Sequence, residues 1–217
     1  MNKPSSEYFE YLNEYKTLHE QKGKFRGSSL LPYIVPIKKL ISDNKCKTLL
    51  DYGCGKALAY SDDYAEFEIK KPLPEYWELD SYTLYDPAYP KYSKEPTGKY
   101  DVVICTDVLE HIPEQDLDWV INKVVKYSNK IVFFNICTVP ALKHFKEGKF
   151  KGQNLHISVF EDQWWIKKIG KIWESNKDVK IYLTLSTGDD TIIICFKKKG
   201  ESDGNNSTDR TSDKTAG

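Results

Sequence analysis

Short apolar runs alternate with amphipathic segments from residue 47 to residue 199, and this alternation is the feature that most constrains the fold. The runs "YDVVICTD" (100–107) and "KIVFFNIC" (130–137) are almost continuously apolar, which is typical of strands buried on both faces. Between them, apolar residues recur from Leu117 to Val125 at the spacing of one helix face. Strands that alternate with helices usually form a mostly parallel sheet. We therefore expect an α/β, doubly wound fold.

The flanking segments extend this pattern at both ends. Further strands are expected over 47–53 and 81–87. The runs 179–186 and 191–199 are separated by Thr-Gly-Asp-Asp, which predicts an antiparallel hairpin at the C-terminal edge of the sheet. Helices are expected over 5–20, about 36–42, 113–127 and 158–176. The last helix opens with a capping-box spacing, Ser158 followed by Glu161.

Composition divides the chain into three parts. Residues 1–44 are expected to form an N-terminal helical segment, in which "FRGSSLLPY" (25–33) is either a lid over the core or a simple connector. Residues 45–200 carry the α/β domain. Residues 201–217 contain almost no apolar side chain, so we expect a disordered tail there.

The charge balance, the cysteines and the spacing of possible metal ligands limit which partners and cofactors we expect. Lys and Arg together number 32, as do Asp and Glu, so the net charge is zero and no nucleic-acid partner is expected. The five cysteines form no C-x-x-C pair, which favours buried, reduced thiols. His, Asp and Glu do not cluster at ligand spacing in the sequence, so no metal site is predicted. No signal peptide and no membrane-spanning run is apparent, so we expect a soluble, cytoplasmic protein of undetermined oligomeric state.

A glycine turn comes after the first expected strand, in "LLDYGCGKA". The dinucleotide fingerprint G-x-G-x-x-G would need glycine at position 58, where the chain has Leu58. The pattern D-x-G-x-G-x-(G/A) fits instead, at Asp51, Gly53, Gly55 and Ala57. Glycines at such a turn let the backbone approach a ligand closely, and a subsequent helix would offer unpaired N–H groups.

An acidic residue, Asp86, ends the second expected strand in "YTLYDP". An acid in this place accepts hydrogen bonds from ribose hydroxyls in nucleotide-binding α/β folds, although Asp86 lies farther beyond the glycine turn than the usual spacing of about 20 residues. The alternative is a residue that forms a turn before Pro87.

These two motifs and "YDVVICTDVLEHIPEQDL" (100–117) stand in the order of a known motif set. Together they resemble class I S-adenosylmethionine-dependent methyltransferases of the quinone-biosynthesis type, over about residues 45–140. The resemblance implies a Rossmann-like fold and S-adenosyl-L-methionine as the cofactor. It implies a donor site made by Asp51, Gly53, Gly55, Asp86 and Asp107. The chain departs from the family after Asp86, where "AYPKYSKEPTGK" is too short for a further helix and strand, so Tyr85, Thr106 and Asp107 are only candidates for the adenine pocket.

Methyl transfer requires a positioned acceptor and, for a hydroxyl or ammonium, a general base. We expect His111 and His156 to be the catalytic candidates. Glu110 is adjacent to His111, and neighbours on a helical turn diverge by about 100°, so the two cannot both face the ligand. The loop around His156 also offers Asn154, Trp164 and Trp165 as lining for an aromatic acceptor pocket. A lone histidine is also commonly a structural residue, and that alternative stays open for His156.

Three functions remain open. The first is methyl transfer to a small-molecule acceptor, which the sequence does not identify. The second is a non-catalytic donor-binding or scaffold protein on the same frame. The third takes "DPAY" (86–89) as a variant of the D-P-P-Y motif of DNA amino-methyltransferases, which the neutral charge disfavours.

Overall fold

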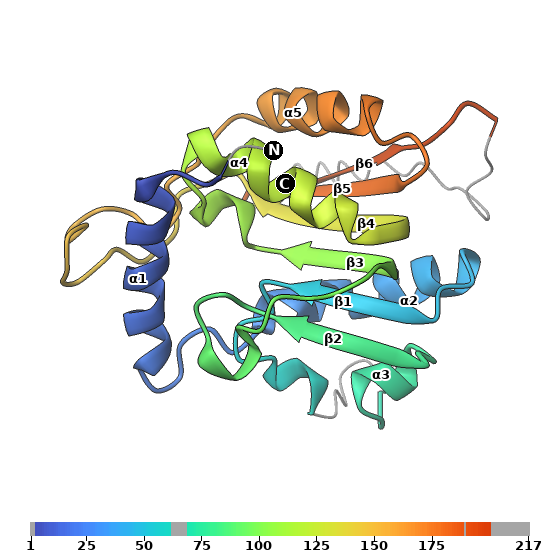
Figure 1. The fold of residues 1–217 in the computed structure, drawn as a ribbon, viewed down its shortest axis with the longest axis horizontal. Coiled ribbons are helices and arrows are strands. Elements are labelled where there is room, and N and C mark those ends of the chain that lie inside the picture. The colour runs from blue at the N-terminus through green and yellow to red at the C-terminus, as the bar shows by residue number, and fades with distance from the viewer. Residues whose placement is uncertain (1–2, 62–68, 189, 201–217) are drawn as a thin grey trace, which may run out of the picture.

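The computed structural model describes residues 3–61, 69–188 and 190–200. Its described strands form one sheet in the order β2-β1-β3-β4-β5-β6, with β1 to β5 parallel and β6 antiparallel to β5 (Figure 1). The strands are β1 (Thr48–Tyr52), β2 (Ser81–Tyr85), β3 (Tyr100–Thr106), β4 (Ser128–Cys137), β5 (Lys180–Ser186) and β6 (Thr191–Phe196). The predicted α/β, mostly parallel sheet with a C-terminal antiparallel hairpin is confirmed, and the architecture is Rossmann-like.

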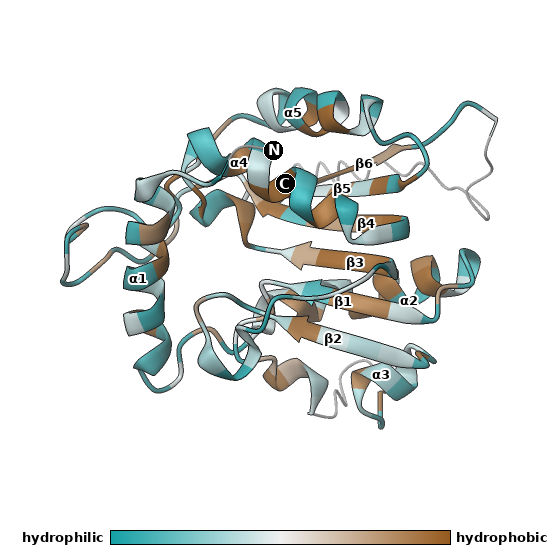
Figure 2. Cartoon of the chain, in the orientation of Figure 1, coloured by the Kyte–Doolittle hydropathy of each residue, from teal (hydrophilic) through white to brown (hydrophobic). Residues whose placement is uncertain are grey.

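Helices cover both faces of this sheet. The α-helices are α1 (Ser6–Glu20), α2 (Ile34–Asp43), α3 (Leu73–Tyr76), α4 (Glu114–Lys126) and α5 (Asp162–Glu174). Short 3-10 helices lie between them: η1 (Ser28–Tyr33), η2 (Leu58–Tyr60), η4 (Pro90–Tyr92) and η5 (Leu109–His111). Helices α4 and α5 pack on one face and α2 and α3 on the other, so the apolar strands are enclosed between two helical layers (Figure 2).

The continuous apolar runs result from this enclosure. Successive strand residues point to opposite faces, and here both faces are buried. Leu50 and Val103 pack with α4 and α5, whereas their neighbours Leu49 and Val102 pack with α2 and α3. All four side chains are at most 1% exposed, so neither face of these strands tolerates a polar residue at these positions.

Helix α1 lies across the end of the sheet toward which the parallel strands point (Figure 1). Ser5 caps it, because its hydroxyl accepts a hydrogen bond from the Tyr8 amide and donates one to the Asp116 carboxylate of α4. Farther along α1, Tyr11 and Tyr15 pack in a separate apolar cluster with loop residues that come after β4. The N-terminal segment is therefore a cover over the carboxyl ends of the strands, where α/β folds of this kind bind their ligands.

One local prediction is wrong. The capping box at Ser158 does not form, because α5 begins at Asp162 and the Ser158 hydroxyl instead donates to the Ile112 carbonyl oxygen. The predicted short region between Asp86 and β3 is confirmed, since only η4 lies there. The expected disordered tail (201–217) falls outside the described residues, as do residues 62–68. Among the helices that the structure describes, none is long and apolar enough to cross a membrane.

Candidate functional site

The glycine turn connects β1 to η2 and brings three chain segments together. Gly53 has φ +87°, and a Cβ there would overlap the Val108 side chain at the end of β3. Gly55 has φ +57°, and a Cβ there would lie 2.7 Å from the Phe25 carbonyl oxygen. Glycine is therefore required at both positions, by backbone conformation and by close approach.

Backbone amides of this turn already donate to acceptors within the chain. Gly53 and Cys54 donate to the Tyr85 carbonyl oxygen at 2.7 and 3.1 Å, Gly55 to the Asp86 carboxylate at 2.9 Å, Lys56 to Phe25 at 2.7 Å, Ala57 to Cys54 at 3.0 Å and Leu58 to Arg26 at 3.0 Å. The expectation of a helix with unpaired N–H groups directly after the turn is wrong. The chain forms the three-residue η2 there, and the segment 25–27 occupies two of the amides.

Asp86 lies directly after β2 and holds the turn. Its Oδ2 accepts from Gly55 and its Oδ1 accepts from the Ala88 amide at 2.8 Å. His19 of α1 places its Nε2 3.8 Å from Asp86 Oδ2 and stacks on Phe25, with ring centroids 4.6 Å apart. Burial lowers the pKa of His19. Asp86 therefore holds the turn, and it also lines the cavity between α1 and the strand ends.

Of the residues expected to form the donor site, Asp51 is the one that does not line the cavity between α1 and the ends of β1, β2 and β3. It is buried within β1, outside the cavity lining, and accepts a hydrogen bond from the Tyr60 hydroxyl at 2.8 Å. Burial raises the pKa of this carboxyl to about 7, with the Tyr60 hydrogen bond acting in the opposite direction. Asp51 therefore holds η2, the segment directly after the turn, through Tyr60.

A cavity of about 140 Å³ lies between α1 and the ends of β1, β2 and β3. Six candidate residues named from the sequence line it: Gly53, Gly55, Asp86, Thr106, Asp107 and His111. Sequence reasoning missed the contribution of α1 and β1 to the lining, made by Tyr8, Tyr11, Tyr15, His19 and Tyr52. Tyr8, Tyr11 and Tyr15 recur in the sequence at helical spacing, which indicates a buried face but not which surface it covers. Within the described part of the chain, Tyr52 Oη and His19 Nδ1 are buried without a hydrogen-bond partner.

Asp107 and His111 form the far wall of the cavity. Asp107 has φ +52° and accepts a hydrogen bond from the Asn135 amide group, and burial raises its pKa. Burial lowers the pKa of His111 to about 4, so its imidazole is neutral near pH 7. His111 Nδ1 lies 2.9 Å from the Tyr15 hydroxyl and 2.9 Å from the Leu155 carbonyl oxygen.

His156 lies behind this wall rather than in the cavity lining. Its ring is in edge contact with that of His111, with centroids 4.9 Å apart. The residues expected to line an acceptor pocket beside it lie in other contacts. The Asn154 amide group pairs with both backbone polar groups of Ala141, Trp165 is buried in the core, and Trp164 stacks on Phe160 at 3.9 Å.

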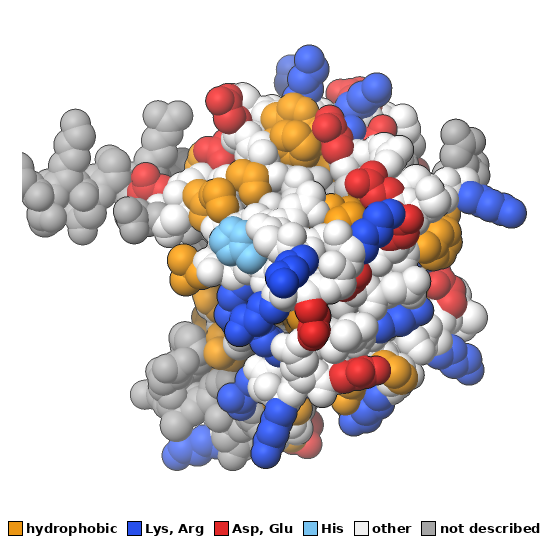
Figure 3. Space-filling model, turned by 90° about the vertical axis from the view of Figure 1, so that its left-hand side faces the viewer, with side chains coloured by type: hydrophobic (Ala, Val, Ile, Leu, Met, Phe, Trp, Pro, Cys, Tyr) orange, Lys and Arg blue, Asp and Glu red, His pale blue; other side chains and the backbone are white. Residues whose placement is uncertain are grey.

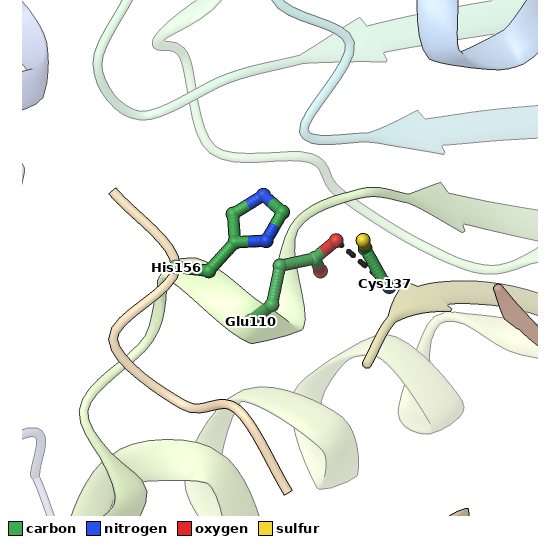
Figure 4. Close-up of side chains that lie close together, drawn as sticks. All are labelled: Glu110, Cys137 and His156. Carbon is green, nitrogen blue, oxygen red and sulfur yellow. Dashed lines mark hydrogen bonds between the residues drawn. The ribbon is translucent and has the colours of Figure 1, made fainter. Parts of the chain in front are cut away.

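Two further candidates are separated from the cavity. The Tyr85 hydroxyl donates to Glu95 at 2.9 Å, so this candidate for the adenine pocket lies outside the lining. Glu110 diverges from His111, as expected for adjacent residues on a helical turn, and its Oε1 accepts from the Cys137 amide at 2.9 Å. Glu110, Cys137 and His156 lie close enough to share a metal ion (Figure 4).

The comparisons with protein-family models, curated proteins and solved structures found no match. The site must therefore be interpreted from its own residues.

On the face of the molecule that includes α1, basic and acidic side chains are interspersed (Figure 3).

Proposed function

We propose that this chain is a cytoplasmic S-adenosylmethionine-dependent methyltransferase that acts on a small-molecule acceptor. The observation that carries the proposal is the convergence of Gly53, Gly55, Asp86 and Asp107 on one cavity at the carboxyl ends of β1, β2 and β3. Strand order reverses between β1 and β3, which is where doubly wound folds place nucleotide ligands. The unpartnered polar atoms of Tyr52 and His19 also favour a polar ligand there.

The residues present fit the donor once the cover moves. A cavity of about 140 Å³ is smaller than the roughly 300–1,000 Å³ of typical ligand pockets, so α1 and residues 25–27 must be displaced. Displacement would release the Lys56 and Leu58 amides from Phe25 and Arg26, and those amides could then bind a carboxylate. Asp86 could exchange an amide for ribose hydroxyls.

S-adenosylmethionine, when bound, supplies an electrophilic methyl group. The chain's contribution is then to orient the acceptor and to exclude water. His111 is neutral and faces the cavity, so one of its ring nitrogens can take a proton from an acceptor hydroxyl. Tyr15 holds the other side of this ring, so that α1 both covers the cavity and fixes the proposed base.

Calorimetric titration with S-adenosylhomocysteine tests the proposal. We expect micromolar binding to the wild type and at least a tenfold loss in Asp86→Asn, because that carboxylate is the proposed ribose acceptor. Asp101→Asn is the matched control, since Asp101 also accepts a backbone amide, that of Lys47, but at the amino-terminal end of β3, away from the cavity. Absence of binding to a folded wild type, or equal binding by both variants, would contradict the donor site.

A non-catalytic scaffold is the second candidate, and a specific observation favours it. The amides of residues 53–58 are satisfied within the chain, which is what a fold that no longer binds a donor would show. A folded wild type that releases no heat with S-adenosylhomocysteine at any concentration tested would support this candidate over the enzyme.

A further inference from the structure

Three side chains of metal-ligand type meet behind the cavity wall. Glu110 comes from η5, Cys137 from the end of β4 and His156 from the loop that precedes α5 (Figure 4). One ligand atom from each lies within 4.8 Å of the other two. The sequence predicted no metal site, because these residues are far apart along the chain and only the fold assembles them.

Glu110 is the residue that points to a missing partner. It is fully buried, and its Oε1 accepts from the Cys137 amide. Its Oε2 is also buried and finds no hydrogen-bond partner among the described residues. A buried carboxylate oxygen without a partner is costly, and a cation bound to it would remove that cost.

The His156 ring nitrogen that lies nearer to Glu110 and Cys137 is Nδ1 (Figure 4). This Nδ1 lies 2.7 Å from the Val139 carbonyl oxygen. Because a carbonyl can only accept, Nδ1 carries the proton and Nε2 keeps its lone pair. Histidines that bind a metal through one ring nitrogen commonly donate a hydrogen bond from the other, so the His156 ring must turn its Nε2 toward Glu110 and Cys137 to bind an ion.

The loop that carries His156 is itself fixed to Glu110. The Ile157 and Ser158 amides donate to the Glu110 backbone carbonyl at 2.9 and 3.0 Å. The His156 amide donates to the Asn154 side chain, which also pairs with Ala141. The backbone around the cluster is therefore tied together before any ion binds, which limits the ordering cost of binding.

We propose that Glu110, Cys137 and His156 form a zinc site. A carboxylate, a thiolate and an imidazole together favour Zn²⁺ over harder cations. A tetrahedral Zn²⁺ holds such ligand atoms about 3.3–3.8 Å apart, so the three side chains must move closer together to bind it. Three protein ligands leave the fourth position for water or a substrate atom. This inference does not rest on the proposed methyl transfer.

The test uses the full chain, dialysed against a chelator and then titrated with Zn²⁺ or Co²⁺. We expect one ion per chain, and with Co²⁺ a thiolate-to-metal charge-transfer band together with tetrahedral d–d absorption. Glu110→Gln, Cys137→Ser and His156→Gln should each weaken Zn²⁺ binding by at least about 100-fold, since even the loss of a group that only orients a ligand costs about 10–100-fold. Cys195→Ser and His144→Gln are the matched controls and should leave affinity unchanged.

The spectrum of the wild type keeps the test decisive if a variant does not fold. Absence of the thiolate band in the wild type would overturn the three-ligand site. Binding that the cluster variants and the control variants weaken equally, or not at all, would show an adventitious ion only and would also overturn it.

Discussion

The glycine turn and the cluster of Glu110, Cys137 and His156 lie at neighbouring strand ends. They differ in whether their buried carboxylate oxygens have hydrogen-bond partners. At the turn, both Asp86 carboxylate oxygens accept backbone amides, and other turn amides are bonded to residues 25–27. In the cluster, one oxygen of the buried Glu110 has no partner among the described residues. A ligand at the turn must therefore displace bonds within the protein, whereas a cation at the cluster would add bonds that are missing.

The largest expected effect is on the pH dependence of stability, and it comes from the burial of Asp51 in β1. Its pKa in the folded protein is about 7, against about 3.9 when unfolded. The folded state therefore favours the protonated acid, and the stability present below about pH 4 is lost as the pH rises through 7. The loss amounts to about 4 kcal/mol. The side chain at position 51 of Asp51→Asn cannot ionise. The free energy of unfolding of this variant, relative to that of the wild type, should therefore rise by that amount between about pH 4 and pH 9.

Urea unfolding of both proteins between about pH 4 and pH 9 measures this difference. Parallel pH profiles for the wild type and Asp51→Asn would contradict the prediction, because they would mean that the buried carboxylate is as well stabilised when ionised as when protonated.

A smaller effect compares the two regions directly. Asp86→Asn replaces an oxygen that accepts a buried amide, so we expect a loss of about 2 kcal/mol in the free energy of unfolding. Glu110→Gln keeps an oxygen for the Cys137 amide and changes only the unpartnered position, so the metal-depleted protein should lose less than about 1 kcal/mol. Urea unfolding near pH 6 gives both values. Equal losses would remove the contrast between the two regions.

Much of the fold could be predicted from local patterns. Continuously apolar strands such as β3 and β4 identify themselves, because two-sided burial excludes polar residues from them. The start of α5 was mispredicted for a tertiary reason. Ser158 has the residue type and spacing of a cap, but its hydroxyl finds an acceptor 46 positions away in sequence, at Ile112.

The site was predictable only in part. The glycines and Asp86 lie just beyond strands whose ends must meet, so the topology accounts for their convergence. The cover made by α1 could not be foreseen, because a row of tyrosines indicates a buried face without naming its partner. Cys137 was placed in an apolar strand run, and nothing in its neighbourhood along the chain points to Glu110 or His156.

The most direct test of a covered donor site titrates S-adenosylhomocysteine into the wild type and Ser5→Ala. Ser5 anchors α1 to Asp116 and lies outside the cavity lining, so its loss weakens the cover by about 1 kcal/mol without touching the ligand. Ser175→Ala, at the end of α5, is the control. We predict that the wild type binds and that Ser5→Ala binds about fivefold more tightly, because a larger fraction of it is open. Absence of binding to both folded proteins would contradict the donor site.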